Sequence, residues 1–435
     1  MKGKIWKKMI AGIAAVCMLA SLTACGSSEG AKKADEAENI ELTLGFNVET
    51  SDAAYERDIV PIFEAFMKEH PEVTNIKLTG MGKMSEDQQV TRLTGGEYDD
   101  VLLLPMSMKT TDMPNYFADL GDASELGNKY FYGDYMQDGG KTYALPIGVV
   151  YEGLVYNQKV LDECYGGKVP TTLDELMECC TAIHDAGKIC FYTNAGAQWP
   201  MRFWDNLAVT MSEDPAFANT IVTNKAPWTE GQPMYQAANL LGEFAAKGYL
   251  EPDVVTEQWD ASRVSIATGE TAFMLIGTWA IPQLKEIAVE MGEDPENIKF
   301  APFPYKNDVN ADNKLAVRVS EDLFMGVNKN SDHLELAKEL CTFFCEHISI
   351  PRGMNEALKD GGKKAAGLEF LDEMDYIQMY SSPAKDPAIA VQGGEAKLDL
   401  FSIGTYLQDY IIQPALEGNA PRFDDLNQVW GSTVK

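Results

Sequence analysis

The sequence predicts an α/β fold, in which helices pack on sheets. Strand-like and helix-like segments alternate along most of the 435 residues, and alternation of this kind favours layers with parallel strands. Several short, fully apolar runs are bounded by turn residues, which is typical of strands buried on both faces of a parallel sheet. The chain is also long enough for two domains of ordinary size.

The first series of elements extends from residue 40 to residue 104. Apolar residues recur at every second position or better in its first strand, and with helical spacing in the segment that follows. Its helices are expected to end where proline or paired glycines interrupt them. The expected elements are a strand at 40–46, a helix ending at His70-Pro71, a strand at 76–79, a polar helix at 85–93 and a buried strand at 101–104.

A second series of elements begins after Pro146. Thr172 and Glu175 have the spacing of a capping box, which marks the start of a helix, and Gly248 closes a later amphipathic helix. The expected elements are a strand at 149–156, helices at 172–183, 234–246 and 332–345, and a buried strand at 271–276.

The N-terminus carries an export signal. Four lysines precede an uncharged apolar run from Met9 to Leu22. This run is shorter than the roughly 20 apolar residues that a transmembrane helix needs, so residues 1–24 are predicted to be a signal peptide. The segment that ends at Cys25 reads Leu-Thr-Ala-Cys and resembles the lipobox of bacterial lipoproteins. We therefore expect a lipid on Cys25, a flexible tether at 25–39 and a location on the extracellular face of the cell membrane, or in the periplasm if there are two membranes.

The chain is strongly acidic. It contains 36 basic and 66 acidic residues, for a net charge of −30, and removal of residues 1–24 takes away four lysines and no acid, which leaves −34. A surface of this charge repels nucleic acid and anionic lipid headgroups. We therefore exclude nucleic-acid binding and expect the N-terminal lipid to be the attachment to the membrane.

Six cysteines follow Cys25 in the chain. Several of them lie in helical patterns, where cysteine often serves as a small apolar residue. We favour buried thiols and keep a disulfide as the less favoured alternative, since export permits one. The six are Cys164, Cys179, Cys180, Cys190, Cys341 and Cys345.

The sequence lacks the usual signals of catalytic or metal chemistry. Its four histidines have no metal-ligating spacing, and no Gly-x-Ser-x-Gly nucleophile elbow occurs. The acids are numerous, but none lies in a motif that marks it as catalytic. The sequence thus predicts no metal, no cofactor and no enzymatic activity.

Two segments resemble a known family. The first, 143–157, reads Tyr-Ala-Leu-Pro-Ile-Gly-Val-Val-Tyr-Glu-Gly-Leu-Val-Tyr-Asn and continues at 169–176 with Val-Pro-Thr-Thr-Leu-Asp-Glu-Leu. The second, 267–279, reads Ala-Thr-Gly-Glu-Thr-Ala-Phe-Met-Leu-Ile-Gly-Thr-Trp. Both resemble the extracellular solute-binding proteins of family 1, the maltose-binding-protein-like group that serves ABC sugar importers. The resemblance spans nearly the whole mature chain.

The resemblance implies a two-lobed clamp of the periplasmic-binding-protein type II. Each lobe would be a mixed, mostly parallel sheet flanked by helices, with the ligand cleft between the lobes. Residues 40–150 and 318–378 are expected in lobe 1, and residues 151–317 and 379–435 in lobe 2. Open sheets of this type bind ligands outside the carboxyl ends of their strands, and closure around the ligand is a hinge motion.

The function implied by the resemblance is capture of a carbohydrate. A monomer would bind a mono- or oligosaccharide, close, and deliver it to the permease subunits of an ABC importer, which an ATPase drives. One alternative keeps the clamp and changes the ligand to a polyamine, because Glu49 and Glu152 could attract a cation that aromatic rings cover. An alternative of another class is a surface-anchored glycoside hydrolase, which would need two carboxyl groups facing each other across the substrate.

The candidate ligand-binding residues begin with Trp279. In the family a tryptophan at this place often stacks on a sugar ring, because a flat indole covers the apolar face of a pyranose and loses little entropy on ordering. Tyr151 and Glu152 lie at the first crossover, where a carboxylate can accept hydrogen bonds from vicinal hydroxyls. Trp199 and Asn194 lie in a loop that resembles the family loop supplying an aromatic ring to the cleft.

A second group of candidates is placed at the cleft by position alone. Asn47 and Glu49 follow the first predicted strand, and Met106 and Ser107 follow the strand that begins after Asp100. The family often has a polar, acidic residue where Met106 and Ser107 stand, so the hydrogen-bond pattern toward the ligand departs from the family here. Tyr406, in the last helical part of the chain, completes the candidates.

Overall fold

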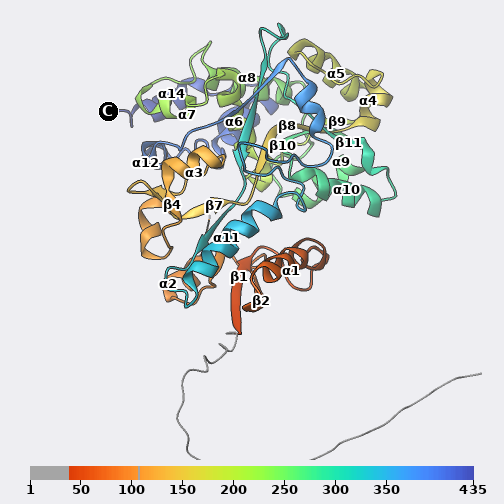
Figure 1. The fold of residues 1–435 in the computed structure, drawn as a ribbon. Helices are drawn as coiled ribbons and strands as arrows, with labels where there is room; N and C mark the ends of the chain where they lie inside the picture. The colour runs from red at the N-terminus through yellow and green to blue at the C-terminus, as the bar shows by residue number, and fades with distance from the viewer. Residues whose placement is uncertain (1–38, 106–107) are drawn as a thin grey trace, which may run out of the picture. The chain divides into compact units, whose positions relative to one another are not determined.

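The computed structural model describes residues 39–105 and 108–435. The predicted signal peptide, the predicted lipidation site Cys25 and most of the predicted tether lie outside the described residues, as do Met106 and Ser107. Residues 39–435 form one compact unit (Figure 1). In the part of the chain that the structure describes, no helix has the length and apolar character needed to cross a membrane.

The first sheet contains five strands. The predicted strand β1 pairs in parallel with its neighbours β2 and β3, whereas β13 runs antiparallel to β3 and β7. Every residue of β3 and β7 is buried, as expected for the fully apolar run at 101–104. In spatial order the strands are β2 (Val73–Gly80), β1 (Ile40–Phe46), β3 (Val101–Leu103), β13 (Phe324–Val327) and β7 (Ala144–Pro146).

Three helices accompany the first sheet: α1 (Val60–Glu69), α2 (Glu86–Gly95) and α11 (Leu334–Ile348). Helix α2 begins with a complete capping box, which satisfies two backbone N–H groups that would otherwise lack partners. The apolar face of α11 packs on β1, where the ring centroid of Phe344 lies 5.1 Å from that of Phe46. Helices α1 and α11 also contact each other, with the ring centroids of Phe66 and Phe343 5.5 Å apart, and Figure 1 shows both helices beside β1.

The second sheet contains six strands around β8. All nine residues of β8 and all seven of β10 are buried, which agrees with their apolar sequences. The spatial order is β14 (Ile377–Ser381), β12 (Leu315–Glu321), β8 (Val149–Asn157), β10 (Thr271–Gly277) and β9 (Ile189–Phe191), and β11 (Ile298–Ala301) also pairs with β8. Strands β12 and β14 thus belong to the sheet that contains β8 rather than to the sheet that contains β1.

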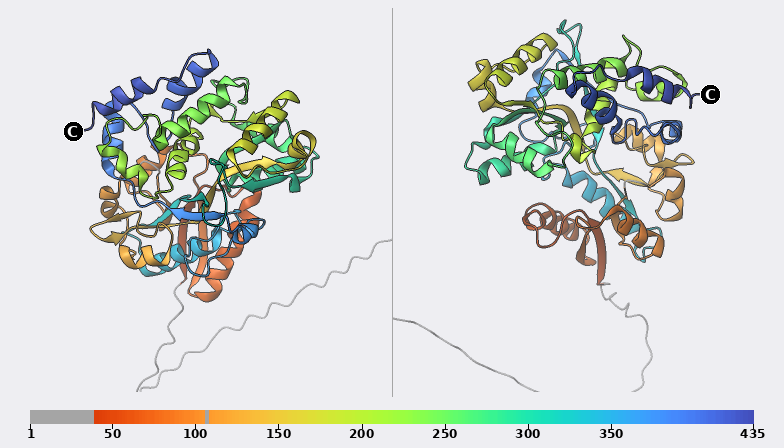
Figure 2. Two further views of the ribbon diagram at one scale, coloured as in Figure 1. Left: turned by 90° about the horizontal axis from the view of Figure 1, so that it is seen from above. Right: turned by 180° about the vertical axis from the view of Figure 1, so that it is seen from behind.

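Helices pack on the second sheet and on one another. Thr172 caps α5, because its hydroxyl accepts a hydrogen bond from the amide of Glu175 at 3.3 Å. The rings of Phe191 and Phe244 stack in the core with centroids 4.8 Å apart. The helices are α4 (Gln158–Tyr165), α5 (Leu173–Asp185), α6 (Met201–Ser212), α7 (Phe217–Thr220), α8 (Pro233–Ala246), α9 (Trp259–Thr268), α10 (Ala280–Glu290), α12 (Pro387–Ala396), α13 (Gln413–Leu416) and α14 (Phe423–Gly431). Figure 2 shows the last helices of the chain beside the green helices of the middle of the chain.

Smaller elements complete the chain. A three-stranded sheet follows the order β4 (Gly121–Asp122), β6 (Lys141–Thr142), β5 (Gln137–Asp138), next to helix α3 (Ala123–Lys129). Short 3₁₀ or π segments lie at Tyr55–Ile59, Thr110–Asn115, Ala195–Ala197, Ile221–Thr223, Pro295–Asn297, Glu369–Glu373 and Gln408–Ile412.

The chain passes between the two large sheets three times. The first passage lies between β7 and β8, the second between β12 and β13, and the third between α11 and β14. The first two passages run side by side and are joined by a hydrogen bond of 2.9 Å from the amide of Ile147 to the carbonyl of Leu323. Every antiparallel pairing in the two large sheets involves β8 or β13. The passages therefore explain why the sheets contain more antiparallel pairing than strand–helix alternation alone indicates.

The preference for free thiols is wrong for one pair of cysteines. Cys180 on α5 and Cys190 on β9 form a disulfide, with Cα atoms 5.4 Å apart. Helix α5 leads directly into β9 and packs on it, which brings the two residues within disulfide range. The prediction of buried thiols is confirmed for Cys179, Cys341 and Cys345.

Candidate functional site

A cavity of about 900 Å³ opens where the two sheets are joined. Its walls come from the ends of strands and from the segments that connect the sheets. Asn47 follows β1, Trp279 follows β10, Asp322 lies between β12 and β13, and Arg352 follows α11. The full lining is Asn47, Val150, Trp199, Arg202, Phe203, Trp279, Gln283, Glu321, Asp322, Leu323, Arg352, Met354, Ser402 and Ile403.

Three tryptophans form a cluster beside this cavity. The ring centroid of Trp199 lies 5.8 Å from that of Trp279 and 4.9 Å from that of Trp259, and Trp259 and Trp279 are 6.0 Å apart. Trp199 and Trp279 line the cavity, whereas Trp259 packs behind them. The indole of Trp279 folds back over Gly277, where a Cβ atom would lie 2.7 Å from its Cδ1. A larger residue at 277 would therefore displace the ring.

The lining residues that follow β1 and α11 are polar. The guanidinium of Arg352 donates a hydrogen bond of 2.8 Å to Oδ1 of Asn47 and lies 5.0 Å from the ring centroid of Phe46. Burial raises the pKa of Asp322, and the charges of Arg352 and Arg202 oppose that rise. Burial also lowers the pKa of Arg352, although Asp322 stabilises its charge. The cavity thus combines flat aromatic surface with hydrogen-bonding groups.

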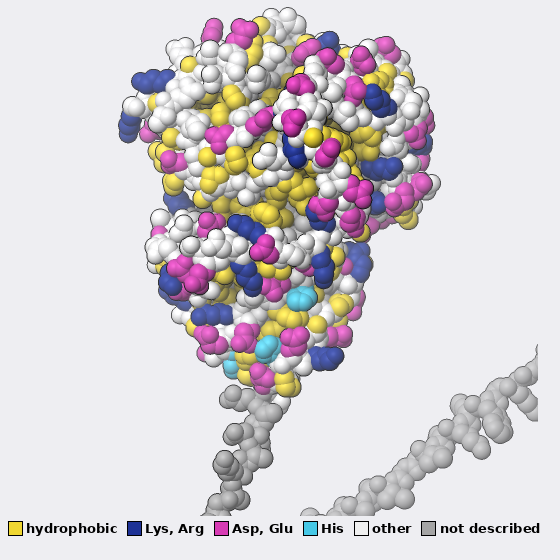
Figure 3. Space-filling view, turned by 45° about the horizontal axis from the view of Figure 1, so that its top comes forward, with side chains coloured by type: hydrophobic (Ala, Val, Ile, Leu, Met, Phe, Trp, Pro, Cys, Tyr) yellow, Lys and Arg dark blue, Asp and Glu magenta, His cyan; other side chains and the backbone are white. Residues whose placement is uncertain are grey.

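A second cavity of about 240 Å³ shares five lining residues with the first. The shared residues are Arg202, Glu321, Asp322, Leu323 and Ser402. Its remaining wall includes two further cations, Arg318 and Lys385. Because the two hollows share a wall, we treat them as one branched site. Figure 3 shows acidic side chains scattered over one face of the molecule and hydrophobic side chains gathered in the band between its upper and lower parts.

Three of the candidate residues come together in the large cavity. Trp279, Trp199 and Asn47 all line it, although they lie far apart in the sequence. The fold thus brings these three residues to one cavity, and their role in binding a solute stays a prediction. Met106 and Ser107 lie outside the described residues.

Tyr151 and Glu152 do not line the cavity. Both lie in the buried strand β8, and Oε1 of Glu152 accepts hydrogen bonds from Arg318 Nη1 at 2.5 Å and from Asn206 Nδ2 at 3.4 Å. The amide of Tyr151 donates to the hydroxyl of Thr278, and the amide of Thr278 donates to the carbonyl of Tyr151. Burial raises the pKa of the Tyr151 phenol to about 12. In this conformation Glu152 neutralises a buried arginine.

Asn194, Glu49 and Tyr406 also lie outside the cavity wall. Asn194 is buried with a positive φ of 56°, and its Oδ1 has no hydrogen-bond partner among the described residues. The carboxylate of Glu49 covers Gly80 and accepts a hydrogen bond from the amide of Lys83 at 3.3 Å. The hydroxyl of Tyr406 donates to Oδ1 of Asp205 in the core. Burial, together with the charge of Asp205 and this hydrogen bond, raises the pKa of the Tyr406 phenol well above its ordinary value.

The sequence analysis missed several residues of the site. Arg202, Asp322, Arg352 and Gln283 line the cavity, and Trp259 supports the tryptophans. Asp322 could have been found, because it interrupts the apolar pattern between two strand-like runs. Arg202 and Arg352 carry no local signal, since each is a single arginine in an ordinary helix start or turn.

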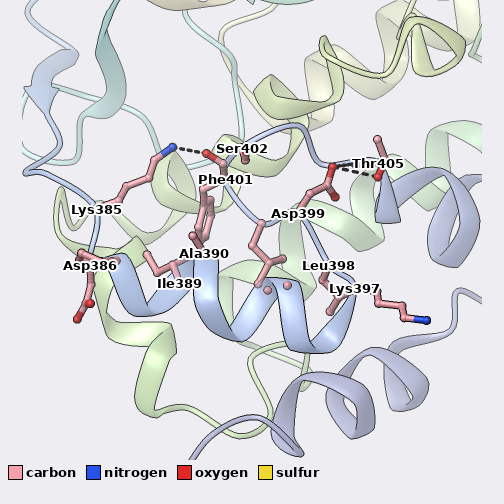
Figure 4. A pocket seen from close by; sticks show the side chains of 14 residues that line it. Lys385, Asp386, Ile389, Ala390, Lys397, Leu398, Asp399, Phe401, Ser402 and Thr405 are labelled. Atoms are coloured by element: carbon pink, nitrogen blue, oxygen red, sulfur yellow. Dashed lines mark hydrogen bonds between the residues drawn. The ribbon is translucent and has the colours of Figure 1, made fainter. Parts of the chain in front are cut away.

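Another hollow, of about 610 Å³, lies between helix α12 and the loop that follows it (Figure 4). Figure 4 shows Asp399 accepting hydrogen bonds from Thr405, at 3.0 Å from its amide and 2.9 Å from its hydroxyl. On the other side Lys385 donates to the carbonyl of Phe401. These bonds shape the loop whose next residues, Ser402 and Ile403, line the large cavity.

Two α/β sheets joined by three passages, with a mixed aromatic and polar cavity at the junction, define a solute-binding clamp. The chain belongs to the bacterial extracellular solute-binding protein family, whose profile matches residues 53–345. No curated protein sequence gives a significant match.

Solved structures of similar fold cover nearly the whole chain. The binding protein BlMnBP1 of an ABC transporter from Bifidobacterium animalis subsp. lactis, in complex with mannobiose, is 24% identical with a TM-score of 0.74, over 91% of this chain and 95% of that one. The manno-oligosaccharide-specific BlMnBP2 of the same organism, in complex with mannotriose, is 23% identical with a TM-score of 0.76, over 92% and 96%. RafE from Streptococcus pneumoniae is 18% identical with a TM-score of 0.64, over 92% and 99%. At these identities the likeness establishes the shared fold.

Proposed function

We propose that this protein captures a mono- or oligosaccharide outside the cell and delivers it to the permease of an ABC importer. The observation that carries the proposal is the pairing of Trp199 and Trp279 in the lining of the 900 Å³ cavity, which also contains Asn47 and Arg352. Indole rings cover the apolar faces of sugar rings, and the polar groups can bind hydroxyls. The sugar complexes of proteins with the same fold support this choice.

The proposed mechanism is hinge closure around the solute. The lobes are centred on the two large sheets, and the passages at Ile147-Gly148, at Asp322-Leu323 and between α11 and β14 act as hinges. A bound sugar that contacts both walls stabilises the closed state, since a ligand shifts the equilibrium by its differential affinity. The permease pair recognises the closed form, and the protein acts as a monomer without catalysis.

The attachment to the membrane belongs to the same proposal. A lipid on Cys25 holds the protein at the extracellular face, and residues 25–39 act as the tether. The predicted signal peptide and the extracellular nature of the family support this arrangement.

The charges at the cavity favour a sugar over a polyamine. Glu152 is engaged by Arg318, and Glu49 does not line the cavity, so the two carboxylates that could attract a polyamine are occupied or distant from it. The cavity acids Glu321 and Asp322 are consecutive residues. A glycoside hydrolase would instead need carboxyl groups on opposite sides of the substrate.

A thermal-shift screen tests the proposal. The chain from Ala31 onward, which contains the whole compact unit, is heated with mono-, di- and oligosaccharides, spermidine and putrescine. A sugar present at 100 times its Kd should stabilise the folded state by about 2.7 kcal/mol. A shift with polyamines alone would contradict sugar capture and leave the clamp intact.

A further inference from the structure

The branched site carries an excess of positive charge in a strongly acidic protein. Four cations line it: Arg202, Arg318, Arg352 and Lys385. The acids on its wall are Glu321 and Asp322, and Glu152 lies behind them on Arg318. The chain as a whole has 66 acidic and only 36 basic residues. The site is therefore positively charged although the protein as a whole is negatively charged, and this concentrates positive potential inside the site.

The four cations differ in how closely carboxylates of the protein neutralise their charge. Arg318 forms ion pairs with Glu152 at 2.5 Å and with Glu321 at 3.7 Å. The charge of Asp322 interacts with both Arg352 and Arg202, and the charge of Asp58 also acts on Arg352. Among the described residues, Arg202 has no carboxylate within ion-pair distance, and its guanidinium lies 5.2 Å from the ring centroid of Phe203. Of the four cations, Arg202 is therefore the one whose charge is least matched by hydrogen bonds or ion pairs within the described part of the chain.

The start of helix α6 adds to this positive potential. Trp199, Arg202 and Phe203 all line the cavity, so the first turn of this twelve-residue helix borders it. The first turn contains no acidic residue and no capping side chain. The amides of Met201, Arg202 and Phe203 already donate to the carbonyls of Gln198, Trp199 and Pro200, so the helix contributes through its dipole, which favours negative charge at the helix start. The helix start and the unpaired guanidinium are independent features, and both favour an anion at the same place.

We propose that the solute carries an anionic substituent, such as the carboxylate of a uronic acid, and that Arg202 binds it while the tryptophans stack on its sugar rings. The planar fork of arginine matches the two oxygens of a carboxylate and can also bind sulfate. This inference rests on the proposed capture of a carbohydrate and narrows it to acidic sugars. Burial and neighbouring arginines lower the pKa of Lys385 to about 8, and an anion in the site would oppose that shift.

The test compares matched pairs of sugars by isothermal titration calorimetry with the chain from Ala31 onward. The pairs are galacturonate and galactose oligomers, mannuronate and mannose oligomers, cellobiouronic acid and cellobiose, and sulfated and unsulfated galactose oligomers. We expect at least one acidic member to bind at least ~10-fold more tightly than its neutral partner, with the preference falling as NaCl rises, because salt screens charge. Comparison of the carboxylated pairs with the sulfated pair shows which of the two anionic groups the site binds.

Variants locate the anion. Arg202→Gln should reduce the ratio of acidic to neutral affinity by about 10-fold or more, and Arg202→Lys should restore part of it. Arg422→Gln, which removes a surface arginine paired with Asp425, serves as the matched control and should leave the ratio unchanged. Thermal unfolding of each variant checks that it folds. If a neutral sugar binds and its acidic partner does not, or if Arg202→Gln keeps the ratio, this inference is overturned while sugar capture stands. If no sugar binds, sugar capture falls as well.

Discussion

The indole rings of Trp199 and Trp279 lie with centroids 5.8 Å apart and planes inclined by 41°. The two rings come from different loops at the edge of the second sheet and face the same cavity. Trp259 contacts both from behind, so the rings are held in place before any solute arrives. A preformed aromatic surface reduces the loss of side-chain conformational entropy on binding.

The first prediction concerns Trp279. Trp279→Ala should weaken sugar binding by roughly 10- to 100-fold, or about 1.4–2.8 kcal/mol, because the stacking surface is lost. Isothermal titration with the sugar identified in the screen measures the change. Trp259→Ala is the matched control: it removes a ring of the cluster that does not line the cavity and should weaken binding less. Equal losses in both variants would argue against direct stacking on Trp279.

The second prediction separates a structural from a binding role of Glu152. Glu152→Ala leaves Arg318, which is 3% exposed, without its closest partner. Breaking a buried ion pair from one side costs about 3–5 kcal/mol, so urea unfolding should show a large loss of stability. The double variant Glu152→Met with Arg318→Met should recover much of it. A stable Glu152→Ala protein that no longer binds sugar would instead identify Glu152 as a ligand-binding residue.

The third prediction concerns pH and Asp205. Burial raises the pKa of Asp205 from 3.8 to about 7, while hydrogen bonds from Tyr406 and the amide of Phe401 oppose the rise. Between these two values the folded state holds a proton that the unfolded state releases. The stabilising contribution is therefore complete below about pH 4 and is lost as the pH rises to about 7.

Asp205→Asn should remove this pH dependence. The difference in unfolding free energy between the native protein and the variant should change by on the order of 4 kcal/mol between about pH 4 and pH 7. Urea unfolding at several pH values measures it, and Asp425→Asn on the surface is the control. A difference that does not vary with pH would show that Asp205 titrates normally in the fold.

The fourth prediction concerns the disulfide. Cys180 and Cys190 enclose a short loop, with a sequence separation of 10. Closing a loop of this size stabilises a protein by about 2–3 kcal/mol in the chain-entropy account, so Cys180→Ala with Cys190→Ala should lose about that much. Thiol titration of the unfolded, unreduced chain from Ala31 onward should find four free thiols, at Cys164, Cys179, Cys341 and Cys345. Six free thiols would contradict the disulfide.

The fifth prediction concerns the lipid anchor. Cys25→Ser should release the protein from the membrane fraction into the medium or the periplasm, because the acyl acceptor is lost. Metabolic labelling with a fatty acid analogue should mark the native protein and not the variant. Cys164→Ser is the control, since it changes a cysteine of the folded part. Continued membrane attachment of Cys25→Ser would contradict the lipoprotein prediction.

Much of the fold could be predicted from the sequence, because its signals are local. The alternating or fully apolar runs at β1, β3, β8 and β10 are strands, and the cap at Thr172 starts α5. The order of these elements indicated α/β layers. The sheet partners were less predictable, because pairing with β8 or β13 depends on where the chain passes between sheets.

The candidate site was predictable only where a motif carried it. Trp279 and Trp199 were named from segments that resemble the family, and both line the cavity. Arg202, Asp322 and Arg352 had no such segment, and only the meeting of distant loops makes them neighbours. Glu152 was named from its position, whereas its contact with Arg318 depends on the pairing of β8 with β12.

The sequence by itself determined the acidic charge, the alternation of strands and helices and the family segments, and it predicts the export signal. These properties depend on composition or on residues close together in the chain. The tertiary structure alone decided which side chains face one cavity, which acids are neutralised by arginine and which cysteines pair. Burial and charge act through space, so residues 166 or 201 positions apart, such as Glu152 with Arg318 or Asp205 with Tyr406, acquire their roles only when the chain has folded.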